Sequence, residues 1–172
     1  MDFGKAPNRV HTAEVDRFIT EYGNCILRLC YFYLQDMSLA EDAMQETFVK
    51  VYKQYATYRQ ESSEKTWITR IAINTCKDIR RSTWFKRVDR SVSLDTIPEP
   101  HYEYDPADDT LIQEVMKLQP KLKEVVLLKY YQNLSFQEIA ETLQLPVGTV
   151  STRMNTAKKK LRERLERWYF DE

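Results

Sequence analysis

Apolar residues recur at helical spacing on both sides of a single acidic, proline-containing segment, residues 91–109. That segment holds three of the six prolines and six acidic side chains, and it shows little periodicity. Prolines and clustered like charges oppose a packed helix there. The sequence therefore predicts an all-α fold of two small helical domains, over residues 10–90 and 110–170, joined by a flexible acidic linker.

Three helices are predicted for the first domain. The first spans residues 15–34, and its expected core positions are Val15, Phe18, Ile19, Tyr22, Ile26, Leu29, Cys30 and Tyr33. The second begins at Ser38-Leu-Ala-Glu41, which has the form of a capping box with Ser38 as the N-cap, and it runs to about residue 55. A polar loop, residues 58–65, precedes the third helix, which ends in the basic stretch 77–90.

The residue counts exclude several classes of function. Three glycines are too few for the phosphate-binding loops of nucleotide-dependent enzymes. Cys25, Cys30 and Cys76 form no CxxC pair, so we expect buried thiols, no metal and no cofactor. No apolar run reaches the roughly 18 residues of a membrane-spanning helix, and the N-terminus lacks the apolar stretch of a signal peptide, so we expect a soluble, cytoplasmic protein.

Charge is distributed unevenly although the formal net charge is zero. Residues 1–58 carry a net charge of −2, residues 59–90 of +5, residues 91–119 of −6 and residues 120–172 of +3. Two basic segments that flank an acidic one indicate contact with a polyanion at two places. Ordinary solvated helix faces give the same pattern, so charge alone leaves both interpretations open.

A helix-turn-helix motif is predicted near the C-terminus. Ser135-Phe-Gln-Glu138 is a second capping box that opens a short helix, and Pro146 and Gly148 then interrupt it. Helical spacing resumes with Val150, Met154, Ala157 and Leu161. At 100° per residue the outward positions are Ser151, Thr152, Asn155, Thr156 and Lys159, and the cations placed for phosphates are Arg153, Lys158, Lys159, Lys160 and Arg162. Small polar groups beside cations are typical of a DNA-reading helix, whereas a hairpin used only for packing does not need them.

Residues 48–90 interleave aromatic rings with cations. The rings are Phe48, Tyr52, Tyr55, Tyr58, Trp67, Trp84 and Phe85, and the cations are Arg59, Lys65, Arg70, Lys77, Arg80, Arg81, Lys86 and Arg87. Rings that stack on bases beside cations that bind phosphates describe a surface for single-stranded nucleic acid, with about 1–3 kcal/mol per stacked base. Phe48, Tyr52 and Trp67 fit core positions equally well. An acidic-polar patch on the second helix, either a solvated face or a docking site, consists of Asp42, Gln45 and Glu46.

Three segments in this order and spacing carry a family resemblance. They are Asp42-Ala-Met-Gln-Glu-Thr-Phe48, Thr66-Trp-Ile-Thr-Arg-Ile-Ala-Ile-Asn74 and Leu134-Ser-Phe-Gln-Glu-Ile-Ala-Glu-Thr-Leu-Gln-Leu-Pro-Val-Gly-Thr-Val150. Together they resemble the extracytoplasmic-function group of bacterial RNA polymerase sigma factors, over nearly the whole chain outside the linker and the extreme ends. The resemblance implies a sigma region 2 helical bundle followed by a sigma region 4 helix-turn-helix domain.

The resemblance also implies a function, which is to give RNA polymerase its promoter specificity, with no catalytic residue. The residues implied to bind core polymerase, on the clamp helices of the β′ subunit, are Asp42, Gln45, Glu46 and Phe48. Those implied to recognise and melt the minus-ten element are Tyr58, Arg59, Ser63, Lys65, Trp67, Arg70, Asn74, Lys77 and Arg81. Those implied to read the minus-thirty-five element are Thr149, Ser151, Thr152, Arg153, Asn155, Thr156, Lys158 and Lys159. The second domain would also hold the flap of the β subunit, and an anti-sigma factor, often membrane-anchored, is a usual partner in the family.

Two departures from the family pattern bear on base preference. Glu64-Lys65 stands where relatives often carry Phe-Arg. Ser151, Asn155 and Thr156 stand where relatives often carry arginine or a bulky residue. Because arginine to guanine is the commonest specific contact, their presence predicts fewer bidentate contacts and more reliance on DNA shape.

Two other classes of function fit the sequence less well. A stand-alone helix-turn-helix regulator of duplex DNA needs an effector or dimerisation domain, which the aromatic and basic segment 48–90 does not resemble. A nucleic-acid enzyme needs clustered carboxylates or a histidine base, whereas His11 and His101 fall in the expected tail and linker.

Overall fold

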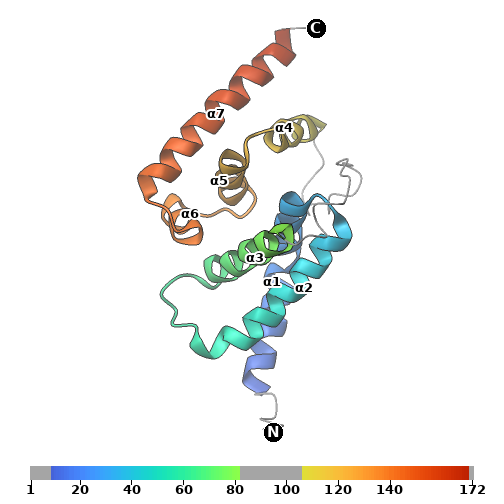
Figure 1. The fold of residues 1–172 in the computed structure, drawn as a ribbon, viewed down its shortest axis with the longest axis vertical. Helices are drawn as coiled ribbons and strands as arrows, with labels where there is room; N and C mark the ends of the chain where they lie inside the picture. The colour runs from blue at the N-terminus through green and yellow to red at the C-terminus, as the bar shows by residue number, and fades with distance from the viewer. Residues whose placement is uncertain (1–8, 82–105, 171–172) are drawn as a thin grey trace. The chain divides into compact units, whose positions relative to one another are not determined.

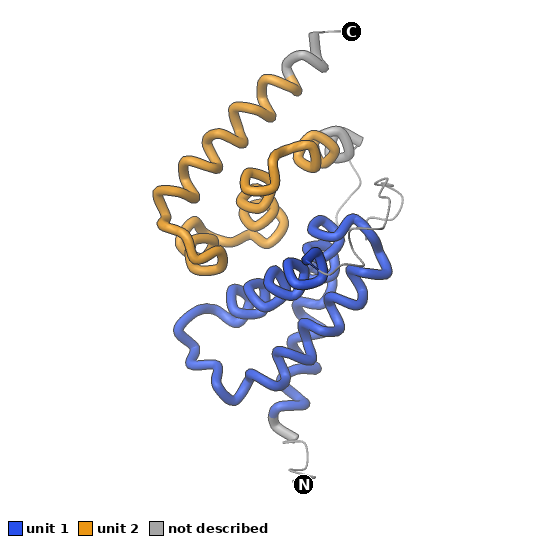
Figure 2. The backbone as a smooth tube through the Cα atoms, viewed as in Figure 1, with its two compact units in different colours: residues 1–98 blue, residues 99–172 orange. Residues whose placement is uncertain are grey.

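A computed structural model describes residues 9–81 and 106–170, in two compact units spanning residues 1–98 and 99–172 (Figures 1 and 2). The described part of unit 1 consists of α1 (Arg9–Leu34), α2 (Met37–Gln54), a 3-10 turn η1 (Tyr55–Thr57) and α3 (Glu64–Arg81). That of unit 2 consists of α4 (Pro106–Met116), α5 (Pro120–Tyr130), α6 (Phe136–Leu143) and α7 (Val147–Phe170). The all-α fold of two helical units is thereby confirmed.

In unit 1, α1, α2 and α3 pack against one another around a shared apolar core (Figure 1). Side chains at or near zero exposure come from all three helices, and they include Phe18, Ile26, Leu29, Ala43, Val51, Ile68, Ala72 and Ile73. Each large apolar side chain buried here contributes about 1.5–3 kcal/mol to folding. The prediction for Ile19 was wrong, since it is 43% exposed. It shares an arc of α1 with buried Cys30, so apolar spacing along a helix does not show how far the neighbouring helices cover each residue.

The expectation of buried thiols is confirmed for two of the three cysteines. Cys30 on α1 and Cys76 on α3 are fully buried, whereas Cys25 is half-buried. A hydrogen bond with the Cys76 side chain, together with burial, holds the pKa of the Cys30 thiol well above its usual range. The Cys30 thiol therefore remains protonated at neutral pH, and both buried cysteines act as small core residues.

The connection between α1 and α2 differs from the predicted capping box. Gln35 takes the left-handed conformation with φ 55°, and Asp36 follows in an extended conformation. The Asp36 carboxylate accepts a hydrogen bond from the Leu39 amide at 2.9 Å, so Asp36 is the N-cap and α2 begins at Met37. Ser38 is an exposed residue inside the helix, and its assignment as N-cap was wrong. Asp and Ser cap about equally well, and the place where α1 ends decided between them.

In unit 2, α7 packs against α4, α5 and α6. The buried apolar side chains include Val125, Leu128, Ile139, Val150, Met154 and Ala157. The predicted capping box is present, because Ser135 Oγ accepts from the Glu138 amide at 3.2 Å and the Ser135 amide donates to Glu138 Oε2 at 2.8 Å. Pro120 lies in the first turn of α5, a position that proline suits.

The turn of the helix-turn-helix motif is shorter than predicted. Gln144, with φ 55°, ends α6 in the left-handed conformation, and α7 begins at Val147. Gly148 therefore lies inside the first turn of α7 and does not oppose the helix.

The segment expected as linker is partly helical, because α4 begins at Pro106, and proline suits a first helical turn. The rest of that segment, residues 91–105, and the basic residues 82–90 lie outside the described residues. Among the helices of the described ranges, none combines the length and apolar character needed to cross a membrane.

Candidate nucleic-acid interfaces

The second helix of the helix-turn-helix motif presents one polar face outward. Val150, Met154 and Ala157 are buried and define the inward side of α7. On the opposite side, Thr152, Asn155, Thr156 and Lys159 are exposed, and Ser151 is half-buried. The predicted orientation of this helix is confirmed, because successive residues rotate by 100° and these positions fall about half a turn from the buried stripe.

The exposed hydroxyls of this face are engaged by the helix itself. Thr152 Oγ1 donates to the Gly148 carbonyl at 2.9 Å, and Thr156 Oγ1 donates to the Thr152 carbonyl at 2.9 Å. Thr149 and Arg153 are half-buried beside this face. The bonded hydroxyls no longer have a proton to donate to a partner.

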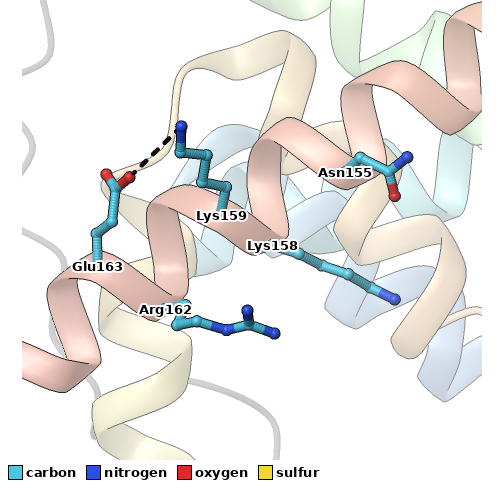
Figure 3. Close-up of a pocket in the computed structure, with 5 residues that line it drawn as sticks. All are labelled: Asn155, Lys158, Lys159, Arg162 and Glu163. Carbon is cyan, nitrogen blue, oxygen red and sulfur yellow. Dashed lines mark ion pairs between the residues drawn. The ribbon is translucent and has the colours of Figure 1, made fainter.

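Cations gather along α7 beyond the polar face (Figure 3). Lys158, Lys159 and Arg162 line one pocket with Asn155 and Glu163. Lys159 Nζ lies 4.0 Å from Glu163 Oε1, an exposed pair that contributes little to stability. The remaining ammonium and guanidinium groups suit phosphates, as predicted from the sequence.

A second polar stripe runs along α3. Arg70, Asn74, Lys77 and Arg81 recur at i, i+4, i+7 and i+11 and so share one side of the helix. Asn74 and Arg81 are exposed, and Arg70 and Lys77 are half-buried. The structure therefore brings together four of the residues that the family resemblance implied for minus-ten DNA.

The loop before α3 is held by its own side chains. Tyr58 stacks on Trp67, with ring centroids 4.5 Å apart and planes inclined by 18°, and its hydroxyl donates to the Ser62 carbonyl. Burial raises the pKa of Tyr58 above its usual value, and the nearby Glu64 carboxylate adds to this effect. Trp67 is only 7% exposed, so its ring belongs to the core rather than to an open stacking surface. Arg59 remains exposed on this loop.

Ser63 has a structural role that the sequence did not indicate. Its Oγ accepts from the Thr66 amide at 3.2 Å and lies 2.8 Å from Thr66 Oγ1. This is the geometry of an N-cap on α3, which begins at the next residue. Lys65, in the first turn, is half-buried.

Arg17 is a residue of this region that sequence reasoning missed. It lies 2.9 Å from Glu64 at the start of α3, and on α1 it lies 2.9 Å from Glu14 and 3.1 Å from Glu21. Hydrogen bonds to Glu64 and Glu14 raise the pKa of the guanidinium further above its usual range. Because Arg17 and Glu64 are far apart in the chain, no local sequence pattern reveals this link between α1 and the loop.

The outer face of α2 carries the acidic-polar patch. Asp42, Gln45 and Glu46 are exposed, and Glu46 lies 2.9 Å from Lys50. Phe48 is only 5% exposed, so its side chain belongs to the core and its place in a surface interface was wrong.

Sequence reasoning missed Val49, whose side chain is 50% exposed. It lies at i+7 from Asp42, so it shares the side of α2 that carries the patch. Asp42, Gln45, Glu46 and Val49 follow the spacing i, i+3, i+4, i+7, which places residues on one side of a helix. One apolar residue at this spacing on an otherwise polar face is the sequence signal that could have identified Val49.

Family models match both units of the chain. The model for Sigma-70 region 2 matches residues 18–86, and the model for Sigma-70, region 4 matches residues 108–161. A similar curated protein is the ECF RNA polymerase sigma factor SigW of Bacillus subtilis, with 32% identity over 96% of this chain and 97% of the relative. Another is the RNA polymerase sigma-H factor of Pseudomonas aeruginosa, with 28% identity over 88% of this chain and 86% of the relative.

Solved structures share the fold. CnrH, solved in complex with the cytosolic domain of CnrY, superposes with a TM-score of 0.67 at 19% identity, over 94% of this chain and 98% of that one. The sigma factor RpoE from Bartonella quintana, solved with the anti-sigma factor NepR, superposes with a TM-score of 0.66 at 20% identity, over 87% of this chain and 97% of that one.

Proposed function

The chain belongs to the extracytoplasmic-function group of RNA polymerase sigma factors, and we propose that its two helical units divide promoter recognition between them. As a member of this family it binds core RNA polymerase and directs promoter-specific transcription initiation. The observation that supports the division of labour is that each unit matches a different sigma region and exposes its own polar, basic helix face.

For unit 1 we propose recognition and melting of the minus-ten element. The α3 stripe of Arg70, Asn74, Lys77 and Arg81 offers cations for phosphates and one amide for a base edge. Exposed Arg59 adds a cation on the loop before α3, and the stacking of Tyr58 on Trp67 holds the shape of that loop before DNA binds. Capture of an unstacked base offsets an opening cost of a few kcal/mol, so melting needs no hydrolysis and no catalytic residue.

For the outer face of α2 we propose docking on the β′ subunit. Asp42, Gln45 and Glu46 supply acidic and polar groups, and Val49 adds an apolar side chain among them. Interfaces of this kind combine apolar contacts with charges that favour one partner. Phe48 supports this face from below, through the core of unit 1.

For unit 2 we propose that α7 enters the major groove of the minus-thirty-five element. Its exposed polar face and flanking cations match the docking of a recognition helix, in which base edges are read by the face and phosphates are held beside it. The reading residues are Ser151, Thr152, Asn155 and Thr156, with Thr149, Arg153, Lys158 and Lys159 beside them. We place contact with the β flap on this unit as well.

We also propose an anti-sigma partner, since RpoE of B. quintana was solved with the anti-sigma factor NepR. A protein that acts on core RNA polymerase works in the bacterial cytoplasm, and any membrane association would come from that partner.

Run-off transcription with purified core RNA polymerase tests this proposal. We expect initiation at discrete sites only when the chain is added. The variant Asp42→Ala/Glu46→Ala should lose initiation together with core binding, whereas Gln54→Ala, at an exposed position of α2 at least 80° around the helix from the patch, should keep both. Duplex binding by the chain with no effect on initiation by active core would instead favour a stand-alone helix-turn-helix regulator.

A further inference from the structure

The middle of the exposed α7 face carries an unusual set of side chains for a DNA-reading helix. Thr152, Asn155 and Thr156 lie within about one helical turn, opposite the buried Val150 and Met154. None of the three is arginine or lysine, the residues that most often read guanine in the major groove. The next cation on this face, Lys159, lies about a turn farther along and is within 4.0 Å of Glu163 (Figure 3).

The two threonines present methyl groups rather than hydroxyl donors. Each hydroxyl donates to the helix carbonyl four residues earlier, at 2.9 Å in both cases. The hydroxyl proton of each threonine is therefore already donated within the helix. The methyl group is the part of each exposed side chain that makes no hydrogen bond to the helix. In the major groove, a threonine methyl finds its complement in the C5 methyl of thymine.

Asn155 lies between these threonines and carries a different chemistry. Its exposed amide has one carbonyl oxygen and two N–H donors. In the major groove this arrangement pairs with adenine, whose N6 amino group donates and whose N7 accepts.

The cations of α7 flank this turn on both sides. Relative to the exposed face, Arg153 and Lys160 lie toward one edge and Lys158 and Arg162 toward the other. Cations on both edges suit the phosphates of the two groove walls. Gly148, one turn earlier, adds no side chain, and a Cβ there would meet nothing within 4 Å in the protein, so the fold itself does not require glycine at this position.

We propose that α7 reads a run of adjacent A·T pairs, in which Asn155 binds an adenine through N6 and N7 and the methyls of Thr152 and Thr156 contact thymine methyls. This inference rests on the proposed function of unit 2 and names the sequence class that it recognises. Thr152 and Thr156 are about 6 Å apart along the helix axis, which corresponds to about two base-pair steps. The three residues therefore reach two or three neighbouring base pairs.

The first experiment selects duplexes from a random upstream region, using the full chain assembled with core polymerase. We expect the bound sequences to share neighbouring A·T pairs in the element that α7 contacts. Thymine is then replaced by deoxyuridine, which lacks only the methyl group. Each methyl lost should weaken binding about fourfold. Replacing the contacted adenine by 7-deazaadenine, which lacks N7, should weaken it about tenfold.

Matched protein variants assign these effects to residues. Thr152→Ser/Thr156→Ser removes both methyls and keeps both hydroxyls, so it should no longer distinguish thymine from deoxyuridine. Thr152→Val/Thr156→Val keeps a methyl at each position and should retain the distinction. Asn155→Ala should lose its response to 7-deazaadenine and keep its response to deoxyuridine. Circular dichroism checks that each exposed-face variant keeps the helical fold.

Failure of the inference is distinguishable from failure of the proposed function. Promoter-dependent initiation with a selected element that lacks neighbouring A·T pairs would overturn the inference alone. Equal affinity of the unaltered protein for thymine-containing and deoxyuridine-containing duplexes would also overturn the inference. So would loss of this difference in Thr152→Val/Thr156→Val, because the difference would then depend on the threonine hydroxyls rather than on their methyl groups. Absence of protein-dependent initiation on every template would overturn both.

Discussion

Phe48 and Val49 are neighbours on α2 with opposite surroundings, and alanine at each tests which side of the helix meets the polymerase. The Phe48 side chain is 5% exposed and lies in the core of unit 1, whereas Val49 is 50% exposed beside Asp42 and Glu46. We expect Phe48→Ala to lower the free energy of unfolding. We expect Val49→Ala to lower the affinity for core polymerase and leave the fold intact.

The magnitudes follow from burial. Truncating a buried phenylalanine to alanine costs about 3–5 kcal/mol, which is a large part of the 5–15 kcal/mol that stabilises a typical domain, so unit 1 of Phe48→Ala should be close to unfolding. An exposed valine contributes little to folding, and its truncation should change stability by less than about 0.5 kcal/mol. Burying the exposed half of that side chain against a partner contributes about 1 kcal/mol, so Val49→Ala should weaken polymerase binding about fivefold.

Urea denaturation followed by circular dichroism measures the first effect, and titration of the fluorescently labelled chain with core polymerase measures the second. Gln54→Ala is the matched control, because Gln54 is exposed on α2 at least 80° around the helix from the patch and from Val49. A Phe48→Ala variant with unchanged stability and weakened polymerase binding would refute the reasoning, since the ring would then be a surface contact. Unchanged binding by Val49→Ala would remove this valine from the interface.

Three further substitutions separate folding roles from DNA contacts. Ser63→Ala should destabilise unit 1 by about 1 kcal/mol in urea denaturation, because it removes the N-cap of α3. Ser63→Asp should keep the stability of the unaltered protein and bind minus-ten DNA less well. Equal stability of the unaltered protein and both variants would contradict the capping role. Gly23→Ala should raise the free energy of unfolding by about 0.5–1 kcal/mol, because alanine favours a helix interior and a Cβ at this position meets only Ile19 Cγ2, at 3.9 Å. A lower midpoint of urea unfolding would show that the site does not accept the methyl group. Arg153→Ala should weaken duplex binding uniformly across sequences. The slope of log affinity against log salt concentration should fall by about one, the value for one lost phosphate contact. Unchanged binding over a salt titration would place Arg153 away from DNA.

Features determined within a few residues of the chain could be predicted from the sequence. The capping box at Ser135 and Glu138 forms as predicted because both partners lie within one turn of α6. The outward face of α7 follows from 100° per residue once the Val150 and Met154 stripe is identified as buried. The three segments that resemble sigma factors predicted the function in transcription initiation, and the family comparison confirmed this prediction.

Structural features could not be predicted from the sequence where two local patterns fitted the same position equally well. Asp36 and Ser38 are both good N-caps, and the left-handed turn at Gln35, where α1 ends, selected Asp36. Phe48 suits a core and an interface equally well by composition, and Ile19 matches the apolar spacing of α1 although it is exposed. The sequence shows which residues share a side of a helix but not how far the neighbouring helices cover that side.

The sequence by itself determined most of the helices, the capping box of α6, the outward face of α7 and the family, because these depend on periodicity and on hydrogen bonds between residues near in the chain. Only the tertiary structure decided which side of α2 is open, that Trp67 is covered by Tyr58, and that Arg17 on α1 reaches Glu64 on α3. The physical reason is that burial and ion pairing across helices depend on how α1, α2 and α3 pack together, and a contact between segments distant in sequence leaves no local pattern to read.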